Sequence, residues 1–197
     1  MQKLLSILLV SLYCLSNQSW AQPLHKTHMI GIQYSDLQVA QAIAGEPLYG
    51  AGVAINYQNF LADDMALGLQ FSYAMGTEKY EYKDIGYENK YGVFSYTFTT
   101  KYNFLPGKFK LYIGLNLGGS FVDVDSNSDT TPYIQDQNSH GMNISLPLGF
   151  NWFATKNFYA TAGYQAGLIV GSTAYISDGI TGFNAGIGYY FNSKKTE

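Results

Sequence analysis

Arginine is absent from this 197-residue chain, and Cys14 is its single cysteine. Charged residues make up 13% of the sequence, against roughly 25% in ordinary soluble domains. The 11 lysines are outnumbered by 14 acidic residues, so we expect no nucleic-acid partner. The mature chain also lacks the ~18 consecutive apolar residues of a membrane-spanning helix. These absences exclude a nucleic-acid-binding protein and a helical membrane protein.

The N-terminus has the three parts of a secretory signal peptide. Lys3 supplies positive charge, residues 4–10 are mostly apolar, and a small-x-small cleavage site ends at Ala21. This apolar run is too short to span a bilayer as a helix. We therefore predict a signal peptide over residues 1–21 and one exported domain over residues 22–197. The single cysteine falls in the signal peptide, so the mature domain depends on no disulfide.

Large apolar and small or polar side chains alternate through most of the remaining chain, which is the pattern of a strand with one apolar face. Eight segments show this alternation: residues 28–36, 48–59, 65–76, 91–104, 109–122, 141–153, 158–171 and 180–192. Three connections are tight turns, at residues 60–64, 105–108 and 154–157, whereas four are longer and polar, at residues 37–47, 77–90, 123–140 and 172–179. The pattern predicts an all-β fold, an eight-stranded antiparallel up-and-down transmembrane β-barrel with short periplasmic turns and longer extracellular loops.

Glycine is concentrated on the polar face of these segments. Of 21 glycines, 14 lie there: Gly31, Gly50, Gly52, Gly68, Gly76, Gly114, Gly118, Gly149, Gly163, Gly167, Gly171, Gly182, Gly186 and Gly188. Glycine weakens a strand, and a narrow barrel whose interior has room only for small side chains would explain the cluster. A soluble eight-stranded barrel needs charge on its outer face. Here Lys101 is the one clear charge in mid-strand, which favours a membrane barrel.

Aromatic residues, 16% of the chain, gather near the ends of the predicted strands. Towards the short turns lie Tyr57, Tyr102, Phe104, Trp152, Phe158, Tyr189 and Phe191. Towards the long loops lie Tyr34, Tyr49, Tyr73, Phe94, Phe121 and Phe183. Amphipathic rings favour the level of the lipid head groups, so we predict two aromatic girdles.

The last predicted strand carries a recognisable motif. Asn184, Gly186, Tyr189 and Phe191 have the spacing of the C-terminal β-signal that the outer-membrane assembly machinery reads. Over residues 28–192, the chain resembles the small outer-membrane barrels typified by the OmpA transmembrane domain and OmpX. The resemblance implies a monomer in the outer membrane of a Gram-negative bacterium, in contact with lipopolysaccharide and recognised by the assembly machinery through these four residues.

A catalytic site is the first alternative that we weigh. Two families of eight-stranded barrels modify lipid A with a histidine, a serine and a carboxylate near the outer rim. His140 lies beside Ser139 and near Asp136, but the His-x-Ser-Asn arrangement of the deacylase is absent. We therefore interpret His140 as a loop residue, and we predict no enzyme, no catalytic residue and no cofactor.

The long loops are acidic. The segment that begins at Asp123 and Asp125 has oxygen ligands at alternate positions, as in a calcium loop, but Ser128 and Ile134 replace the required Gly and Glu. We therefore expect a polar loop without a specific metal site. The long loops and adjoining strand ends contain far more Asp and Glu than Lys, and we hypothesise that Mg²⁺ or Ca²⁺ bridges this acidic rim to lipopolysaccharide.

Two interpretations of the tyrosine-rich segment 78–88 stay open, a binding surface and an extended hairpin. The interior of the barrel is expected to be filled by polar side chains, namely Gln70, Lys101, Tyr112, Asn116, Asn151, Tyr159 and Gln165. A packed lumen predicts a structural or surface-interaction role, such as adhesion, through the extracellular loops. The alternatives are a minor porin-like channel for small or hydrophobic solutes and, third, a barrel enzyme that modifies lipid A.

Overall fold

The structure is a computed structural model that describes residues 26–39, 48–82, 85–105, 107–128, 137–170 and 179–192. The predicted signal peptide, residues 1–21, lies outside these ranges. The strands are β1 (Thr27–Val39), β2 (Leu48–Phe60), β3 (Met65–Tyr82), β4 (Ile85–Phe104), β5 (Phe109–Ser128), β6 (Gln137–Trp152), β7 (Phe158–Val170) and β8 (Ile180–Asn192). A search of the described residues finds no helix with the length and apolar character needed to cross a membrane.

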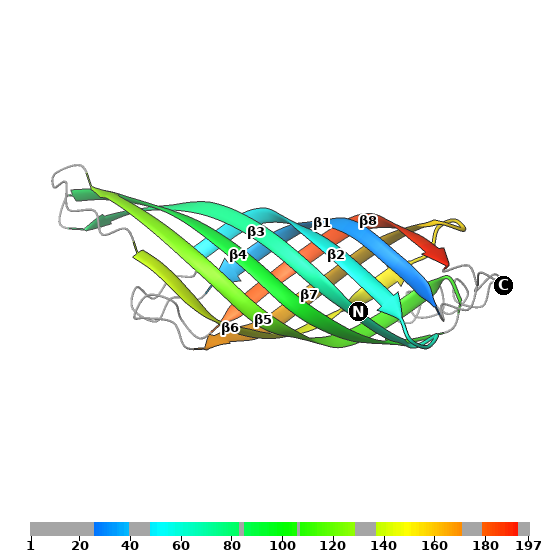
Figure 1. Ribbon diagram of the computed structural model, residues 1–197. Helices are drawn as coiled ribbons and strands as arrows, with labels where there is room; N and C mark the ends of the chain where they lie inside the picture. Colours follow the sequence, from blue (N-terminus) through cyan, green and yellow to red (C-terminus); the bar gives the residue numbers. More distant parts are fainter. Residues whose placement is uncertain are drawn as a thin grey trace, which may run out of the picture.

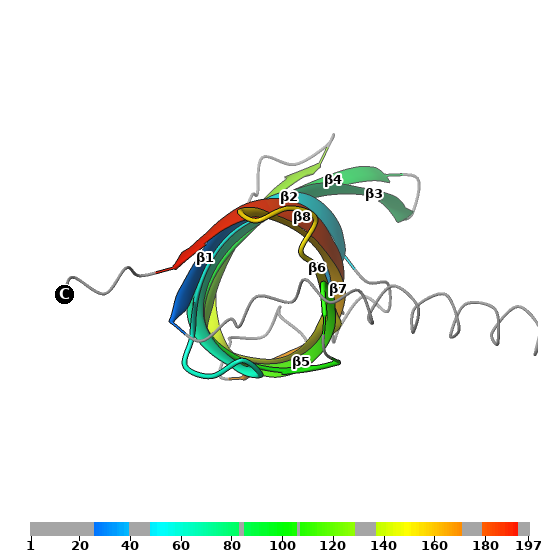
Figure 2. The same ribbon diagram turned by 90° about the vertical axis from the view of Figure 1, so that its right-hand side faces the viewer.

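The eight strands form one closed antiparallel barrel. Each strand pairs with the next along the chain, and β8 returns to pair with β1, where Thr27 lies opposite Asn192. Figure 1 shows the strongly tilted strands from the side, and Figure 2 shows the ring that they enclose. The predicted fold, an all-β up-and-down barrel of eight strands, is confirmed.

The wall of the barrel is apolar outside and polar inside. On β1, Ile30, Ile32 and Tyr34 point outward and are each about half exposed, at 48%, 54% and 52%. Polar side chains such as Asn56 and Asn116 are 2% exposed, because they point into the lumen. All the aromatic residues of the two predicted girdles lie on the outer face, between 40% and 62% exposed. This arrangement reverses that of a soluble protein and fits a wall that faces lipid.

Five strands extend into the predicted long loops, and β1 does so by only three residues, 37–39. β3 and β4 extend through most of the predicted loop 77–90, and β5 and β6 through residues 123–128 and 137–140. The hairpin interpretation of the tyrosine-rich segment is therefore correct, with Tyr80 opposite Tyr87 in the register. The prediction was too short because the alternation of apolar and polar residues ends in these segments, whereas backbone pairing continues through them. Figure 1 shows β3, β4 and β5 reaching beyond the other strands.

The end with the short turns is held by hydrogen bonds between neighbouring turns. The Tyr190 hydroxyl donates to the Thr155 carbonyl over 2.6 Å, and the Thr155 hydroxyl accepts from the Phe158 amide over 3.1 Å. The Phe153 amide donates to the Lys108 carbonyl over 2.7 Å. Both described ends of the chain lie at this end of the barrel, opposite the extended hairpin.

Candidate functional site

The lumen is filled by three layers of side chains. The layer nearest the long loops is apolar and consists of Ala74, Tyr91, Val93, Val122, Ile169 and Ile180. The layer nearest the short turns is also mainly apolar and consists of Met29, Phe60, Ala66, Phe153, Tyr159 and Tyr190. Buried polar side chains such as Asn116, Ser145 and Thr97 lie between them. The expectation that the interior has room only for small side chains is wrong, because Phe60 and four tyrosines are buried there. Two of them, Tyr112 and Tyr159, are among the side chains predicted to fill the lumen, whereas Tyr91 and Tyr190 are not.

Large rings fit the narrow lumen because each lies against glycines of neighbouring strands. Tyr91 lies against Gly50 and Gly76, Tyr112 against Gly149 and Gly163, and Tyr159 against Gly31 and Gly188. A Cβ atom on Gly149, for example, would lie 2.7 Å from the Tyr112 hydroxyl. The glycine-rich polar face thus provides space for particular tyrosine rings, and the register between strands decides which glycine meets which ring.

Polar contacts join the strands across the middle layer. The Ser95 and Ser120 hydroxyls lie 2.7 Å apart, and the Asn143 amide donates to the Ser120 hydroxyl over 2.9 Å. The Tyr159 hydroxyl crosses the lumen from β7 and donates to Asn56 Oδ1 on β2 over 3.2 Å. Of the side chains predicted to fill the lumen, five are buried there: Lys101, Tyr112, Asn116, Asn151 and Tyr159. The lumen is therefore a packed core with a polar centre.

Two lysines point into the lumen. Lys101 is 5% exposed, and its ammonium lies 4.3 Å from the centre of the Tyr112 ring. No Asp or Glu is among the buried side chains of the described residues, so the aromatic ring is the main electrostatic partner of Lys101. Lys110, nearer the short turns, is 8% exposed and interacts electrostatically with Asp63 and Asp64. Sequence reasoning missed Lys110, although it alternates in phase with Tyr112 on the same strand.

The two described histidines lie on the outer face of the wall. His28 Nδ1 is hydrogen-bonded to the Tyr57 hydroxyl at 2.6 Å, and its ring stacks on Phe191 at 5.4 Å, so it belongs to the girdle near the short turns. His140 begins the outward face of β6 and lies 6.2 Å from the Phe121 ring. Asp136, its predicted catalytic neighbour, lies outside the described residues, as does the Ser139 side chain.

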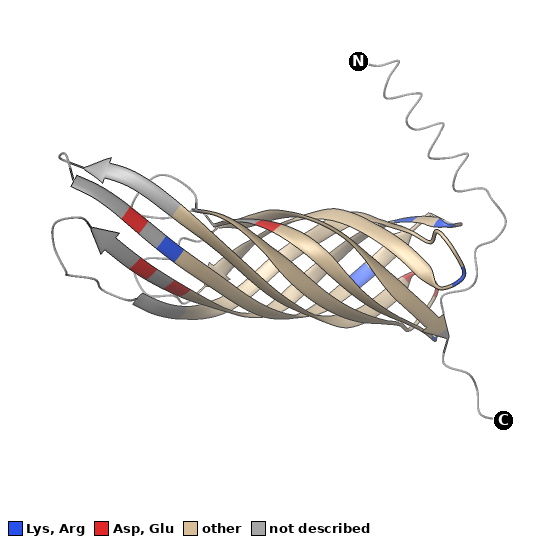
Figure 3. Cartoon of the chain, turned by 90° about the horizontal axis from the view of Figure 1, so that it is seen from above, with Lys and Arg blue, Asp and Glu red and all other residues tan. Residues whose placement is uncertain are grey.

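The acidic segment of β5 lies on the outer face beyond the girdle. Asp123 and Asp125 are both exposed and point away from the lumen. Within the described ranges, no three His, Cys, Asp or Glu side chains gather where they could hold a metal ion. Figure 3 shows that charged residues gather towards the two ends of the barrel, while the wall between them is almost free of charge.

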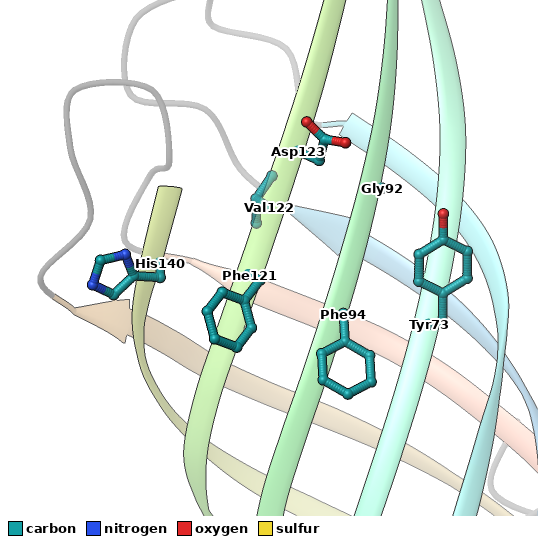
Figure 4. Close-up of a pocket in the computed structure, with 7 residues that line it drawn as sticks. All are labelled: Tyr73, Gly92, Phe94, Phe121, Val122, Asp123 and His140. Carbon is teal, nitrogen blue, oxygen red and sulfur yellow. The ribbon is translucent and has the colours of Figure 1, made fainter. Parts of the chain in front are cut away.

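A hollow of about 390 Å³ opens on the outer wall near the long loops. We call it the Gly92 notch, and the residues that line it include Tyr73, Gly92, Phe94, Phe121, Asp123 and His140. Gly92 leaves the space, and the Tyr73 hydroxyl partly covers it, at 3.1 Å from the position that a Cβ on Gly92 would take. Figure 4 shows the rings of His140, Phe121, Phe94 and Tyr73 in a row across four neighbouring strands, with Gly92 and the Asp123 carboxylate further along them. Sequence reasoning could not find the notch, because its residues come from four separate strands.

No family model matches the sequence, and no curated protein matches it. Solved structures do share its fold. The chain is similar to neisserial surface protein A (NspA), with a TM-score of 0.64 and 15% identity over 83% of this chain and 97% of that chain. It is similar to Ail, the attachment invasion locus protein of Yersinia pestis, with a TM-score of 0.61 and 14% identity over 85% and 99%.

A third similar structure is the outer membrane protein OprG from Pseudomonas aeruginosa, with a TM-score of 0.58 and 12% identity over 86% of this chain and 97% of that chain. Each of the three barrels is covered almost completely, so the likeness extends over the whole fold. At these identities the comparison establishes the fold: the chain folds as a small outer-membrane β-barrel.

Proposed function

We propose that the protein is an outer-membrane barrel of a Gram-negative bacterium that presents a protruding β-sheet to the outside, with a structural or surface-interaction role such as adhesion. The closed barrel, the apolar outer wall and the two girdles support the location. The packed lumen supports a structural or surface-interaction role rather than a channel. None of the three similar structures is described as an enzyme, and Ail is named for attachment and invasion.

The unequal length of the strands is the observation that carries this proposal. β3, β4 and β5 have 18, 20 and 20 residues, whereas β1, β2, β7 and β8 have 13 each. At ~3.3 Å per residue, the longer strands extend roughly 17–23 Å further along their own direction. The extension is not needed to anchor the protein in the membrane. It would serve to present a surface to a partner outside the membrane.

Removal of the protruding hairpin tests the surface role. In the variant, a two-residue Asn-Gly turn replaces residues 77–90, and cells that display it are compared with wild-type cells in binding to host cells and extracellular matrix. We expect binding to fall to the background of cells without the protein. Replacement of residues 172–178 by a Gly-Ser segment of equal length is the matched control. Migration of unboiled samples on gels verifies that both variants fold, and undiminished binding by the hairpin variant would refute the proposal.

A minor channel is the alternative function, and the filled lumen argues against it. Tyr91, Tyr112 and Tyr159 occupy three levels of the barrel, and apolar layers lie at both ends. A planar-bilayer recording of the purified protein separates the two functions. We expect no steady current, and stepwise currents through the wild-type barrel would favour the channel.

We also infer that the assembly machinery recognises Asn184, Gly186, Tyr189 and Phe191. The inference is supported by their place on β8, the closing strand, and by the outward rings of Tyr189 and Phe191, which stack at 6.1 Å. In a variant with Ala at both aromatic positions, we expect less folded barrel in the membrane of growing cells but normal refolding into detergent in vitro. Equal amounts of folded protein in cells would contradict this role.

Divalent cations are a further part of the proposal. The exposed carboxylates of Asp123 and Asp125 lie just beyond the girdle, where anionic lipopolysaccharide would repel them unless Mg²⁺ or Ca²⁺ lay between. In native membranes, removal of divalent cations with EDTA should lower the melting temperature of the barrel. An unchanged melting temperature would remove the cation bridge from the proposal.

A further inference from the structure

The outer face of β1 and β2 changes from apolar to polar at the girdle near the short turns. His28 lies directly opposite Asn59 of β2, and side chains in this relation have Cβ atoms about 5 Å apart. Lys26, two positions before His28, is exposed, and its amide donates to the Phe60 carbonyl over 3.0 Å, which holds it beside the end of β2. We call Lys26, His28 and Asn59 the seam cluster, because they lie next to the seam between β1 and β8.

The ring of His28 is fixed by its neighbours. Its Nδ1 is hydrogen-bonded to the Tyr57 hydroxyl at 2.6 Å, and the ring stacks on Tyr57 at 5.9 Å and on Phe191 at 5.4 Å. When the Tyr57 hydroxyl donates to Nδ1, the proton of the neutral imidazole lies on Nε2. The half-buried His28 therefore holds an N–H donor at the level of the girdle.

The charge of the seam cluster is positive. Among the described residues, the outer faces of β1, β2 and β8 carry no Asp or Glu in the half of the barrel near the short turns. Asp63 and Asp64, in the turn after β2, interact electrostatically with Lys110. The ammonium of Lys26 and the N–H donors of His28 and Asn59 together suit an anion with several acceptor oxygens.

The level of the seam cluster identifies the molecule that would bring this anion. The short turns face the periplasm, so the lipids around this end of the wall belong to the inner leaflet, which consists of glycerophospholipids. Their phosphates lie at the level of the girdle rings, and their acyl chains lie along the apolar wall, which here includes Ile30 and Tyr189. Lipopolysaccharide contacts the opposite end of the barrel.

We propose that the seam cluster binds the phosphodiester of an anionic glycerophospholipid of the inner leaflet. Lys26 pairs with the phosphate charge, and His28 Nε2 and the Asn59 amide donate to its oxygens. A zwitterionic lipid fits less well, because its own ammonium neutralises the phosphate and is repelled by Lys26. This inference rests on the membrane location in the proposed function, and it is independent of the adhesive role and of the cation bridge near the long loops.

Retained lipid measures the selectivity. The full barrel is reconstituted at pH 7 into vesicles with equal parts of phosphatidylglycerol, phosphatidylethanolamine and phosphatidylcholine of identical acyl chains, extracted in mild neutral detergent, and analysed by native mass spectrometry. We expect one phosphatidylglycerol per barrel, preferred about fivefold over each zwitterionic lipid, the factor expected for one lysine beside an anionic lipid. Equal retention of the three lipids would overturn the proposal.

Two variants and a matched control connect the preference to the seam cluster. Lys26→Gln removes the charge, and His28→Phe keeps a ring between Tyr57 and Phe191 but removes the donor. Each variant should weaken the preference, and the double variant should abolish it. Lys156→Gln makes the same change at an exposed lysine of the turn between β6 and β7 and should retain the preference. A double variant that behaves as wild type, or an equal loss in Lys156→Gln, would contradict the assignment.

Histidine ring signals locate the bound lipid on the folded barrel. In neutral detergent, short-chain phosphatidylglycerol should shift the NMR signals of the His28 ring until they saturate. The signals of His140, on the outer face near the long loops, should shift no more than with short-chain phosphatidylcholine. Equal shifts at the two histidines would overturn the site. Failure of the wild-type chain to enter vesicles would instead refute the membrane location.

Discussion

On β7, Tyr159 and Tyr164 carry the same side chain into opposite surroundings. Tyr159 is 3% exposed, lies against Gly31 and Gly188, and donates to Asn56 across the lumen. Tyr164 points outward and is 43% exposed. The Tyr159 ring is fixed by close packing and by its hydrogen bond to Asn56. The Tyr164 ring faces lipid, which accommodates any apolar side chain of similar size. Substitutions inside this barrel are therefore limited by geometry, and substitutions outside it by polarity.

Truncation of the inner tyrosine should have the largest effect. Tyr159→Ala removes the ring that lies against two glycines and leaves Asn56 Oδ1 without its donor. We expect the free energy of unfolding to fall by ~3–5 kcal/mol, as for large-to-small changes in packed cores. Urea unfolding in lipid vesicles measures this loss, with Tyr164→Ala as the outward counterpart. Equal losses for the two variants would remove the contrast between the faces.

Charge on the outer face should have the next largest effect. Leu117 points outward in the middle of the apolar part of β5 and is 44% exposed. A lysine there meets hydrocarbon, so Leu117→Lys should cost ~2–4 kcal/mol, while Val170→Lys near the long loops should cost roughly 0–1 kcal/mol. The same unfolding assay compares the two. If both positions tolerate lysine equally well, this wall does not face a membrane.

Removal of charge from the lumen should increase the stability of the barrel, unlike the two preceding substitutions. Lys101 has an aromatic ring as its main electrostatic partner, and a buried charge without a carboxylate carries a desolvation cost. Lys101→Met retains much of the volume and should raise the free energy of unfolding by about 1 kcal/mol, after subtraction of the lost cation–π contact. A clear loss of stability in the unfolding assay would show that the ammonium makes a net favourable contribution.

The smallest effect should come from one hydroxyl of the middle layer. Ser95→Ala removes the contact with Ser120, which keeps its bond from Asn143. Because Ser120 retains a partner, we expect a loss near the low end of ~0.5–1.5 kcal/mol. The double variant with Ser120→Ala completes a cycle, and strictly additive losses would show that the two serines do not interact.

Much of the fold follows from the sequence because a membrane wall imposes strict alternation. Residues 142–152 and 158–170 alternate without interruption, and both form strands with the predicted faces. The rule acts only where one face meets lipid. It therefore fails for residues 77–82 and 85–90, which pair as strands although their sequence lacks the alternation of apolar and polar residues.

The contents of the lumen and of the notch follow from the sequence only in part. The pattern places Tyr112 and Tyr159 inside, but it does not pair Tyr159 with Gly31 and Gly188, since that contact depends on the register across three strands. In the same way, Gly92 and Asp123 become neighbours through the pairing of β4 with β5. The alternation within one strand predicts which of its residues point inward or outward. A site on the barrel depends in addition on the register between several strands.

The pairing of Thr27 with Asn192 places the first and last strands along a single seam. Until β8 has been synthesised, β1 and β7 are the two edges of an incomplete sheet, and such edges promote aggregation. The last 13-residue strand therefore completes the two remaining hydrogen-bond ladders, one with β7 and one with β1, and so closes the ring. A chain that lacks β8 could not close the sheet, so the loss of one strand would prevent formation of the whole barrel.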